Sequence, residues 1–468
     1  MKRHRYQKRF EALREKYKCF TFYKQEIHID MWGTLNVTFH FSLDDQEYFH
    51  PTMSIPARPF CTWESFPREQ LETLVFHIGM VEMISYWKMA CPKTVVVKPF
   101  DLKLCQKKWW RHLFYMGLGE FRYLNGIKCS EEDFVRIESG TNREFLRLSD
   151  VVFGNVTKSE FDSVDRPLEE KVLVPVGGGK DSVVTLELLR DKMQVIPMMQ
   201  NIRGASVDCV KTAGFDMTTE VAQIDRTLDD NMLSLMMTRS DEFLNGHTPF
   251  SALLAFESLL VAAGSGCKYI ALSNESSANE STVPGTGINH QYSKSYAFEK
   301  EFREYVALHI SNEIQYFSFL RPLNEMQIAS LFSRFTNYHE VFRSCNAGIR
   351  TNSWCGECAK CLFTWIILSP FIPKERLKEI FRKDLSIKPE LRPVFEELNG
   401  TSKVKPFDCV GTVEEVRACV DHMKDRSGTI FEDSPKADTT VEEILKRYNE
   451  ENFLPAKFVD ILKSNLYV

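Results

Sequence analysis

A glycine-rich segment followed by lysine, aspartate and serine is the strongest chemical signal in the sequence. Three consecutive glycines let a backbone approach a phosphate closely and adopt positive φ angles, and the start of a helix adds free N–H groups and the positive end of its dipole. Ser182 can donate to a phosphate oxygen, Lys180 supplies positive charge, and Asp181 can reach a magnesium ion directly or through water. We therefore predict a site for nucleotide phosphates with Mg²⁺. The segment consists of Val176, Gly177, Gly178, Gly179, Lys180, Asp181 and Ser182.

The spacing of this loop differs from two other phosphate-binding patterns. A Walker loop ends in Gly-Lys-Ser/Thr, whereas here Asp181 separates Lys180 from Ser182. The G-x-G-x-x-G dinucleotide pattern is not present in the segment either. The simpler alternative is a plain turn between a strand and a helix, but such a turn rarely needs three glycines before Lys, Asp and Ser.

A second cluster with chemical potential is the run WCGECAKC (354–361), which contains the pattern C-x-x-C-x-x-C. Four thiolates in so short a stretch fit a closed tetrahedral Zn²⁺ site with a structural role. The alternatives are four buried free thiols, an iron–sulfur cluster or a redox-active C-x-x-C pair. The predicted ligands are Cys345, Cys355, Cys358 and Cys361.

Strands and helices that alternate from about residue 171 onward must position both clusters. This alternation predicts an α/β fold with a parallel sheet and helices on both faces. One unfavourable feature is Pro175, near the end of a strand expected to be central. The expected strands are 172–176, 194–199, 215–224 and 267–273, and the expected helices are 183–190, 249–264 and 296–310.

The pattern of apolar residues suggests three domains. Residues 1–165 alternate in the β manner at 27–43 and show helical spacing at 71–90, so we expect an N-terminal α+β domain that binds substrate. Residues 166–371 form the nucleotide domain with the cysteine cluster, and residues 372–468 form a helical, charged C-terminal extension.

Composition and charge limit the classes of function. The chain has 468 residues, 43% of them hydrophobic, and a net charge of -5, which offers no overall basic field for nucleic acid. There is no apolar run long enough to span a membrane and no secretory signal. Nine further cysteines are scattered, which suits free thiols in the cytoplasm. They are Cys19, Cys61, Cys91, Cys105, Cys129, Cys209, Cys267, Cys409 and Cys419. Oligomeric state cannot be predicted from these features.

The glycine-rich loop resembles the pyrophosphatase loop (PP-loop) of the N-type ATP pyrophosphatases, usually written Ser-Gly-Gly-x-Asp-Ser. Those enzymes cleave ATP between its α and β phosphates, and most of them adenylate a carboxylate or carbonyl oxygen. Gly177 replaces the serine at the first position, so one phosphate donor is absent. The resemblance implies ATP and Mg²⁺ as cofactors and AMP and pyrophosphate as products.

In that superfamily the ends of later strands complete the nucleotide site. Gln200 and Asn201 follow the strand expected at 194–199, and we expect them to meet the adenosine. Asn274 and Glu275 follow the strand expected at 267–273, at a carboxyl end where such sheets bind ligands. A merely solvated polar loop is the alternative for them.

Six segments together resemble the UDP-N-acetylmuramoyl-L-alanyl-L-glutamate epimerases, the MurL family. The resemblance implies a small-molecule substrate, a UDP-linked muramoyl dipeptide ending in L-glutamate, and a product ending in D-glutamate for peptidoglycan synthesis. It also implies consumption of ATP with Mg²⁺. The segments are ISYWKMACPK (84–93), VPVGGGKDS (174–182), LSNESSAN (272–279), NHQYSKSYAFEKEF (289–302), WCGECAKC (354–361) and KPFDCVGTVEE (405–415).

Such an epimerisation is chemically reasonable if the carboxylate is first adenylated. Adenylation removes its charge, so the α-proton becomes acidic enough for a side-chain base. The candidates near loops expected to face the site are His290, Lys294 and His247, and Tyr292 can donate a proton. The sequence alone does not choose among them, and each histidine has a purely structural alternative.

A basic, aromatic stretch in the N-terminal domain is a candidate site for the UDP group. Lys107, Lys108 and Arg111 flank Trp109 and Trp110, so cations can contact phosphates while a ring stacks on uracil. The alternative is an amphipathic helix whose basic side chains extend to solvent.

Three other functions stay open. A ligase of the 7-cyano-7-deazaguanine synthase type shares the PP-loop and a comparable cysteine cluster, but it does not need the large N-terminal domain. Transfer RNA thiolation would require a basic face. A nucleotide-binding regulator without turnover has no need for Asp181 beside a magnesium ion.

Overall fold

The computed structural model describes residues 2–57, 61–140, 158 and 160–466. The chain forms two compact units and passes between them several times. The first unit contains the described residues of Met1–Leu168, Gln223–Gly266 and Glu301–Ile314, and the second those of Glu169–Ala222, Cys267–Lys300 and Gln315–Val468.

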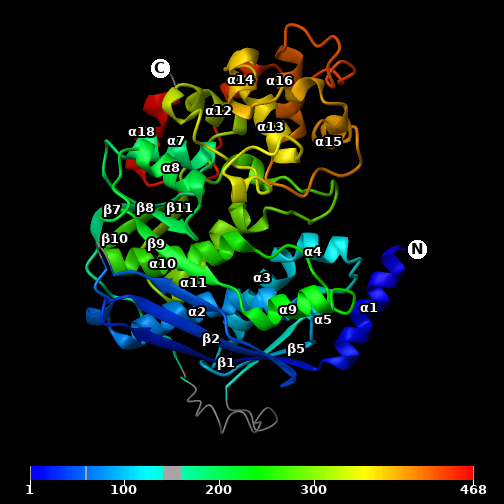
Figure 1. Cartoon of the computed structure of the whole chain (residues 1–468). Helices are drawn as coiled ribbons and strands as arrows, with labels where there is room; N and C mark the ends of the chain where they lie inside the picture. The colour runs from blue at the N-terminus through cyan, green and yellow to red at the C-terminus, as the bar shows by residue number, and fades with distance from the viewer. Residues whose placement is uncertain (1, 58–60, 141–157, 159, 467–468) are drawn as a thin grey trace. The chain divides into compact units, whose positions relative to one another are not determined.

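The second unit is built on parallel strands in the order β11-β10-β7-β8. Figure 1 labels these four strands. Strand β7 lies between β10 and β8, and its last four residues are buried. Apolar residues face one another across these strands, with Val172 opposite Val195 and Leu173 opposite Ile270. The predicted α/β class and the strands expected at 172–176, 194–199 and 267–273 are confirmed. The strands are β7 Glu169–Pro175, β8 Gln194–Gln200, β10 Cys267–Leu272 and β11 Gln315–Ser318.

Pro175 is tolerated because it ends β7. It lies opposite Met198 at the last paired position. The following residue, Val176, donates its N–H to the Met198 carbonyl at 2.8 Å, so the ladder closes just after the proline.

The helices of the second unit surround one hydrophobic core. Val183 and Leu186 of α7 join Phe332 of α12 and Trp365 of α13 in this core. The helix expected at 183–190 is confirmed, although it begins earlier, at Lys180. The helices are α7 Lys180–Leu189, α8 Gly204–Thr212, α12 Glu325–Ser333, α13 Ala359–Leu368, α14 Lys374–Phe381, α15 Arg392–Leu398, α16 Val413–His422, α17 Val441–Leu445 and α18 Ala456–Leu466.

The strand expected at 215–224 is wrong over its first part. The strand observed there, β9, spans Ala222–Thr227 and pairs antiparallel with β4 of the first unit. The preceding residues form a turn because the Asp216 carboxylate accepts the N–H groups of Thr218 and Thr219 at 2.8 and 2.9 Å.

The first unit contains a mixed sheet in the order β9-β4-β2-β1-β5-β6, and β3 also pairs with β2. The alternation at 27–43 produces antiparallel pairing of β1 with β2, in which Ile27 lies opposite Val37. Helix α2 packs on β1, where the rings of Phe22 and Phe76 stack at 5.8 Å. The strands are β1 Cys19–Ile29, β2 Leu35–Leu43, β3 Glu47–Phe49, β4 Thr52–Ile55, β5 Thr94–Val97 and β6 Arg136–Ser139.

The predicted helices at 71–90, 249–264 and 296–310 are also present. Helix α11 begins in the second unit and ends in the first. No helix in the described ranges combines the length and apolar character needed to cross a membrane. The helices of the first unit are α1 Lys2–Lys16, α2 Arg68–Trp87, α3 Leu104–Gly117, α4 Gly119–Leu124, α5 Glu131–Phe134, α9 Asp230–Thr238, α10 Phe250–Ser265 and α11 Tyr296–His309.

Candidate functional site

The glycine-rich loop joins β7 to α7, as its sequence predicted. Gly178 has φ +87°, and a Cβ there would approach the backbone carbon of Ala205 to 2.7 Å, so only glycine fits without a shift. Its carbonyl accepts the N–H of Arg343 at 2.7 Å. At Gly177, by contrast, a Cβ would meet nothing within 4 Å. The loop thus presents the start of a ten-residue helix beside open space, an arrangement suited to phosphate.

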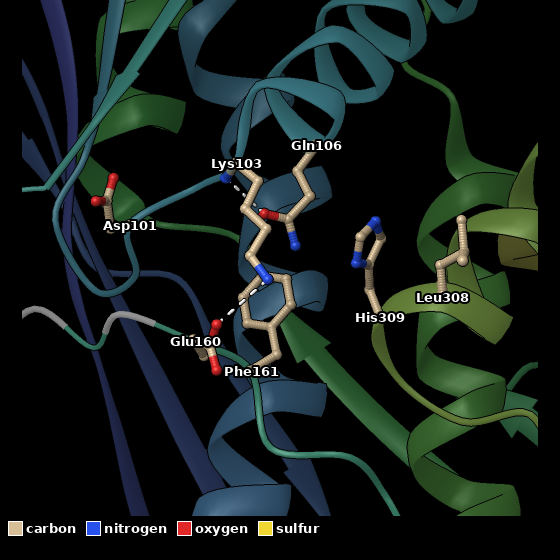
Figure 2. Close-up of a pocket in the computed structure, with 7 residues that line it drawn as sticks. All are labelled: Asp101, Lys103, Gln106, Glu160, Phe161, Leu308 and His309. Carbon is tan, nitrogen blue, oxygen red and sulfur yellow. Dashed lines mark hydrogen bonds and ion pairs between the residues drawn. The ribbon is translucent and has the colours of Figure 1, made fainter.

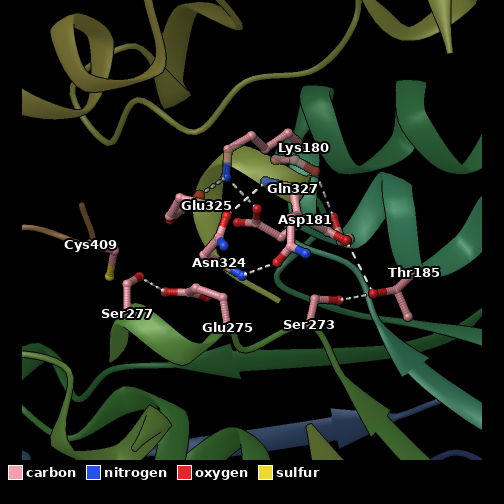
Figure 3. A network of polar contacts seen from close by, with 12 residues as sticks. Lys180, Asp181, Thr185, Ser273, Glu275, Ser277, Asn324, Glu325, Gln327 and Cys409 are labelled. Carbon is pink, nitrogen blue, oxygen red and sulfur yellow. Dashed lines mark hydrogen bonds and ion pairs between the residues drawn. The ribbon is translucent and has the colours of Figure 1, made fainter. Parts of the chain in front are cut away.

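Lys180, the first residue of α7, is held between two carboxylates. Its ammonium donates to Asp181 and Glu325 (Figure 3). The side chains of Lys180 and Glu325 are only 6% and 5% exposed, whereas that of Asp181 is 34% exposed. Burial disfavours the charged lysine, but the two carboxylates outweigh burial and raise the pKa of Lys180. The lysine therefore stays charged and neutralises carboxylates, instead of pointing freely at a phosphate.

Glu325 reaches this position because it is the first residue of α12. The Asn324 side chain accepts the N–H of Gln327 at 2.9 Å, and the Gln327 side-chain oxygen accepts the N–H of Asn324 at 3.0 Å. This reciprocal cap defines where the helix begins. The Glu325 N–H itself donates to Glu415 at 2.7 Å, which ties α12 to the start of α16.

Several carboxylates lie near Lys180, and two of them, Asp181 and Glu275, also interact with the charge of Lys294. Burial raises the pKa of Glu325 against the pull of Lys180, and the charges of Asp181, Glu275 and Glu415 add to the rise. Carboxylate oxygens are ligands that Mg²⁺ prefers. The partly exposed Asp181 is the member of this group that solvent can reach.

Arg321 organises the other side of the site. Its guanidinium is fully buried and lies 3.3 Å from the Glu299 carboxylate. It also donates to the backbone carbonyls of Glu275 and Lys294. One arginine therefore fixes the backbone of two predicted site residues that come from different segments.

Two of the predicted bases meet around a thiol. Lys294 Nζ donates to Cys409 Sγ at 3.3 Å, and the His290 side chain also hydrogen-bonds to Cys409. Burial opposes the charge of Lys294, but the attraction of Cys409 and Glu275 raises the pKa of the lysine. Tyr292, the predicted proton donor, is buried beside Phe298, with ring centroids 5.9 Å apart.

The predicted nucleotide residues occupy the expected edge of the sheet. Gln200 ends β8 and Asn201 follows with φ +47°, so both lie at the same carboxyl edge as the loop after β7. Asn274, after β10, is buried and donates to Ser318 Oγ at 3.0 Å. Contact of these residues with a nucleotide stays a prediction.

Within the loop itself, Ser182 is engaged locally. Its hydroxyl donates to the Gly179 carbonyl at 3.0 Å. A hydroxyl rotates easily, so this contact does not prevent Ser182 from donating to a phosphate.

A cavity of about 360 Å³ opens at the starts of α12 and α16. Its volume is in the range of small-molecule sites. Its wall includes Asn324 and Glu415, the neighbours of Glu325, together with an ion pair of Arg447 and Glu414 at 2.7 Å. The carboxylate group around Lys180 thus lies beside a ligand-sized space.

The four predicted zinc ligands come together. Each of the four sulfurs lies within 4.8 Å of the others, and adjacent pairs are 3.5 to 3.7 Å apart. Zn–S bonds of about 2.3 Å in a tetrahedron require sulfurs roughly 3.8 Å apart, so the spacing fits Zn²⁺. It is far too long for disulfides, whose S–S bond is about 2.05 Å.

Backbone N–H groups complete this cysteine cluster. Gly348 N donates to Cys345 at 3.3 Å, Gly356 N to Cys361 at 3.4 Å and Glu357 N to Cys355 at 3.4 Å. Donors of this kind stabilise thiolates. Hydrogen bonds led by that with Cys361 lower the pKa of Cys358 to about 5, whereas burial raises the pKa of Cys355 and the hydrogen bond with Cys358 raises the pKa of Cys361. The geometry is that of a closed site without a position for substrate.

The basic, aromatic stretch on α3 is largely part of the core of the first unit. Trp110 is fully buried, stacks on Phe256 and donates to the Tyr305 hydroxyl at 3.1 Å. Arg111 is paired with Glu131 at 3.6 Å. Trp110 therefore has no open face for a uracil ring, which favours the amphipathic-helix alternative.

A small polar cavity lies at the start of α3 (Figure 2). Lys103, which pairs with Glu160 at 3.3 Å, and His309 line it. Its volume of about 90 Å³ is well below the roughly 300–1,000 Å³ of typical small-molecule sites, so it does not match the size of a uridine diphosphate site. His247, the third predicted base, belongs to the first unit, where it lies 3.8 Å from the Glu120 carboxylate.

The sequence analysis missed three residues of this site. Glu325 carries one signal, because the Asn-x-x-Gln cap at 324–327 places it at a helix start. Cys409 lies inside the segment KPFDCVGTVEE but was counted as a scattered thiol. Arg321 has no sequence signal, since its role depends on backbone carbonyls from two other segments.

Two family models match the chain. The model described as the MurL N-terminal domain matches residues 11–319, and that described as the MurL C-terminal domain matches residues 341–452. Three similar curated proteins are each named UDP-N-acetyl-alpha-D-muramoyl-L-alanyl-L-glutamate epimerase.

These relatives resemble the chain over most of its length. The protein of Xanthomonas oryzae pv. oryzae is 29% identical over 403 residues, which cover 83% of this chain and 83% of the relative. That of Salinispora tropica is 32% identical over 407 residues, which cover 84% of this chain and 81% of the relative. That of a Micromonospora species is 33% identical over 348 residues, covering 72% of each chain.

Proposed function

The chain belongs to the MurL family, and from this premise we propose that it epimerises the terminal L-glutamate of a UDP-muramoyl dipeptide to D-glutamate. The resemblance of its six segments to that family is confirmed by the family models and by the three relatives. The names of those relatives support the substrate, because similarity extends over 72% to 84% of this chain.

ATP is the co-substrate in this proposal. The α-proton of a free glutamate is a very weak acid, because its loss beside a carboxylate would create a dianion. Adenylation of that carboxylate removes the charge and makes the acyl group an electron sink. The loop at 176–179 would take the phosphates. Pyrophosphate would leave as the carboxylate oxygen bonds to the α-phosphate, and water would later cleave the acyl-adenylate to release AMP and the free carboxylate.

The ATP proposal rests mainly on one observation: the glycine-rich loop and the carboxylates of Asp181 and Glu325 lie together at the start of α7. Gly177 faces open space just before α7. The partly exposed Asp181 is the second residue of that helix and lies beside the buried pair of Lys180 and Glu325. Asp181 would hold Mg²⁺, which when bound neutralises phosphate charge. This arrangement supports membership in the PP-loop class of enzymes.

The cysteine cluster supports a structural Zn²⁺ in the same unit. The spacing of 3.5 to 3.7 Å between sulfurs and the three N–H donors fit a closed site. Such a site would stabilise the segment between α12 and α13 without touching substrate.

A reaction with UDP-MurNAc-L-Ala-L-Glu, ATP and Mg²⁺ tests the proposal. We expect AMP and pyrophosphate by chromatography, and D-glutamate by chiral analysis after hydrolysis of the product. Matched reactions lacking ATP or lacking the dipeptide should give neither change. Substrate-dependent ADP and inorganic phosphate would contradict the PP-loop assignment, and AMP with only L-glutamate would point to a ligase.

A further inference from the structure

Cys409 lies at the centre of a cluster of titratable groups that the ATP chemistry leaves without a task. Lys294 Nζ is 3.3 Å from its sulfur, and His290 hydrogen-bonds to the same atom. The residue is half-buried.

The fold holds this thiol in the candidate active site. Lys405 donates to Glu280 and, at 2.8 Å, to the Gly411 carbonyl, so the loop that carries Cys409 is fixed at both ends. Gly411 packs against Glu325, since a Cβ on the glycine would lie 3.0 Å from Glu325 Cγ. Lys294, its hydrogen-bond donor, also interacts electrostatically with Glu275 and Asp181, and Figure 3 shows Cys409 near Ser277 and Glu275, with no direct contact to the residues drawn.

The charges around Cys409 favour its thiolate form. Burial opposes the thiolate, but Lys294, the hydrogen bond from His290 and the charge of Lys360 together lower the pKa of Cys409 to about 6. A thiol with an ordinary pKa is only a few per cent thiolate at pH 7, whereas a pKa near 6 makes about nine-tenths of it thiolate. The charged Lys294, with its raised pKa, has no free electron pair to accept a proton.

We propose that the Cys409 thiolate is the base that removes the α-proton of the adenylated glutamate, with Lys294 and His290 as its positioning residues. The assignment rests on the proposed function. In this step the α C–H bond breaks, the proton moves to Cys409 Sγ, and the bonding electron pair moves into the activated acyl group. A proton from solvent forms the new C–H bond on the opposite face, and Cys409 returns its proton to solvent.

The test separates proton transfer from adenylation. The unaltered protein, Cys409→Ser and Cys409→Ala react with UDP-MurNAc-L-Ala-L-Glu, ATP and Mg²⁺ in deuterated water, and Cys105→Ser serves as control because Cys105 is an exposed thiol of the first unit. AMP, α-deuterium and glutamate configuration are measured. In both Cys409 variants, deuterium and D-glutamate should form at least about 100-fold more slowly, while AMP formation continues.

A second variant tests the same assignment through pH. The rate of deuterium uptake should fall below about pH 6 in the unaltered protein, because the thiolate is then protonated. Lys294→Met removes the main charge that stabilises the thiolate. The fall of the rate at low pH, the acidic limb of the pH profile, should therefore occur at a pH higher by about one unit or more. Cys105→Ser should leave the limb in place.

The outcomes distinguish the assignment from the function on which it rests. Near-normal deuterium uptake in both Cys409 variants, or an acidic limb that does not move in Lys294→Met, overturns the role of Cys409 and leaves the epimerase intact. If the unaltered protein takes up no deuterium, the proposed function fails as well.

Discussion

Replacing Lys180 by methionine should destabilise the second unit in a way that depends on pH. The change removes the cation that neutralises Asp181 and Glu325 while keeping an unbranched side chain of similar length. Glu325 is only 5% exposed, so its carboxylate would be left buried without a counter-charge. Removing one partner of a buried ion pair costs about 3–5 kcal/mol. Asp181 adds less, because it is 34% exposed and solvent screens it.

The pH dependence follows from the raised pKa of Glu325. Without Lys180 this pKa should rise further. Glu325 in the folded protein then stays protonated at pH values where Glu325 of the unfolded chain, with its ordinary pKa of about 4.3, has lost its proton. The stabilising proton is fully bound at low pH and is lost as pH rises through the folded pKa. The loss of stability relative to the unaltered protein should therefore grow with pH, by at most about 1.4 kcal/mol per unit for one proton.

Thermal unfolding at pH 6, 7 and 8 measures this effect. A loss of about 3 kcal/mol corresponds to roughly 6–12 °C in Tm for a unit of 242 residues. Lys180→Met with Glu325→Gln should recover part of the loss and flatten its pH dependence, since an amide does not titrate. Lys268→Met, which breaks an exposed pair with Glu170, should change Tm little. An equal loss at all three pH values, unchanged by Glu325→Gln, would refute the buried-pair explanation.

Three further predictions address the loop and the metal. Elemental analysis should find about one zinc per chain, and Cys358→Ser should lower Tm by more than about 5 °C, because a closed site contributes to folding; a folded, metal-free protein of unchanged Tm would contradict this. Asp181→Asn should keep its circular dichroism spectrum but form AMP at least about 100-fold more slowly, and near-normal turnover would remove Asp181 from the site. Gly178→Ala should cost about 1–3 kcal/mol in urea unfolding because of its φ of +87°, whereas Gly177→Ala, with open space around its Cβ, should cost clearly less.

Local features of the sequence were the most predictable. The strand, loop and helix around Gly177–Ser182 follow from short-range rules, because the glycines, the apolar run and the helix start are neighbours in the chain. The cysteine cluster was predictable for the same reason, since its ligands lie within seventeen residues, from Cys345 to Cys361.

Long-range features were not predictable in this way. Lys180 meets Glu325 across 145 residues, and Lys294 meets Cys409 across 115. No pattern within one segment reveals such a partner. The strand expected at 215–224 failed for a related reason, because its pairing partner β4 lies far away in the chain and the Asp216 turn occupies its first half.

The most direct test of the central claim is whether proton exchange at the glutamate α-carbon depends on ATP. UDP-MurNAc-L-Ala-L-Glu is incubated with the protein and Mg²⁺ in deuterated water, with and without ATP, and the dipeptide is analysed by mass spectrometry and chiral chromatography. Because only the adenylated carboxyl acidifies the α-proton, we predict one deuterium in the D-glutamate product with ATP and none without it. Deuterium uptake without ATP, or AMP formation with unlabelled L-glutamate, would contradict the account.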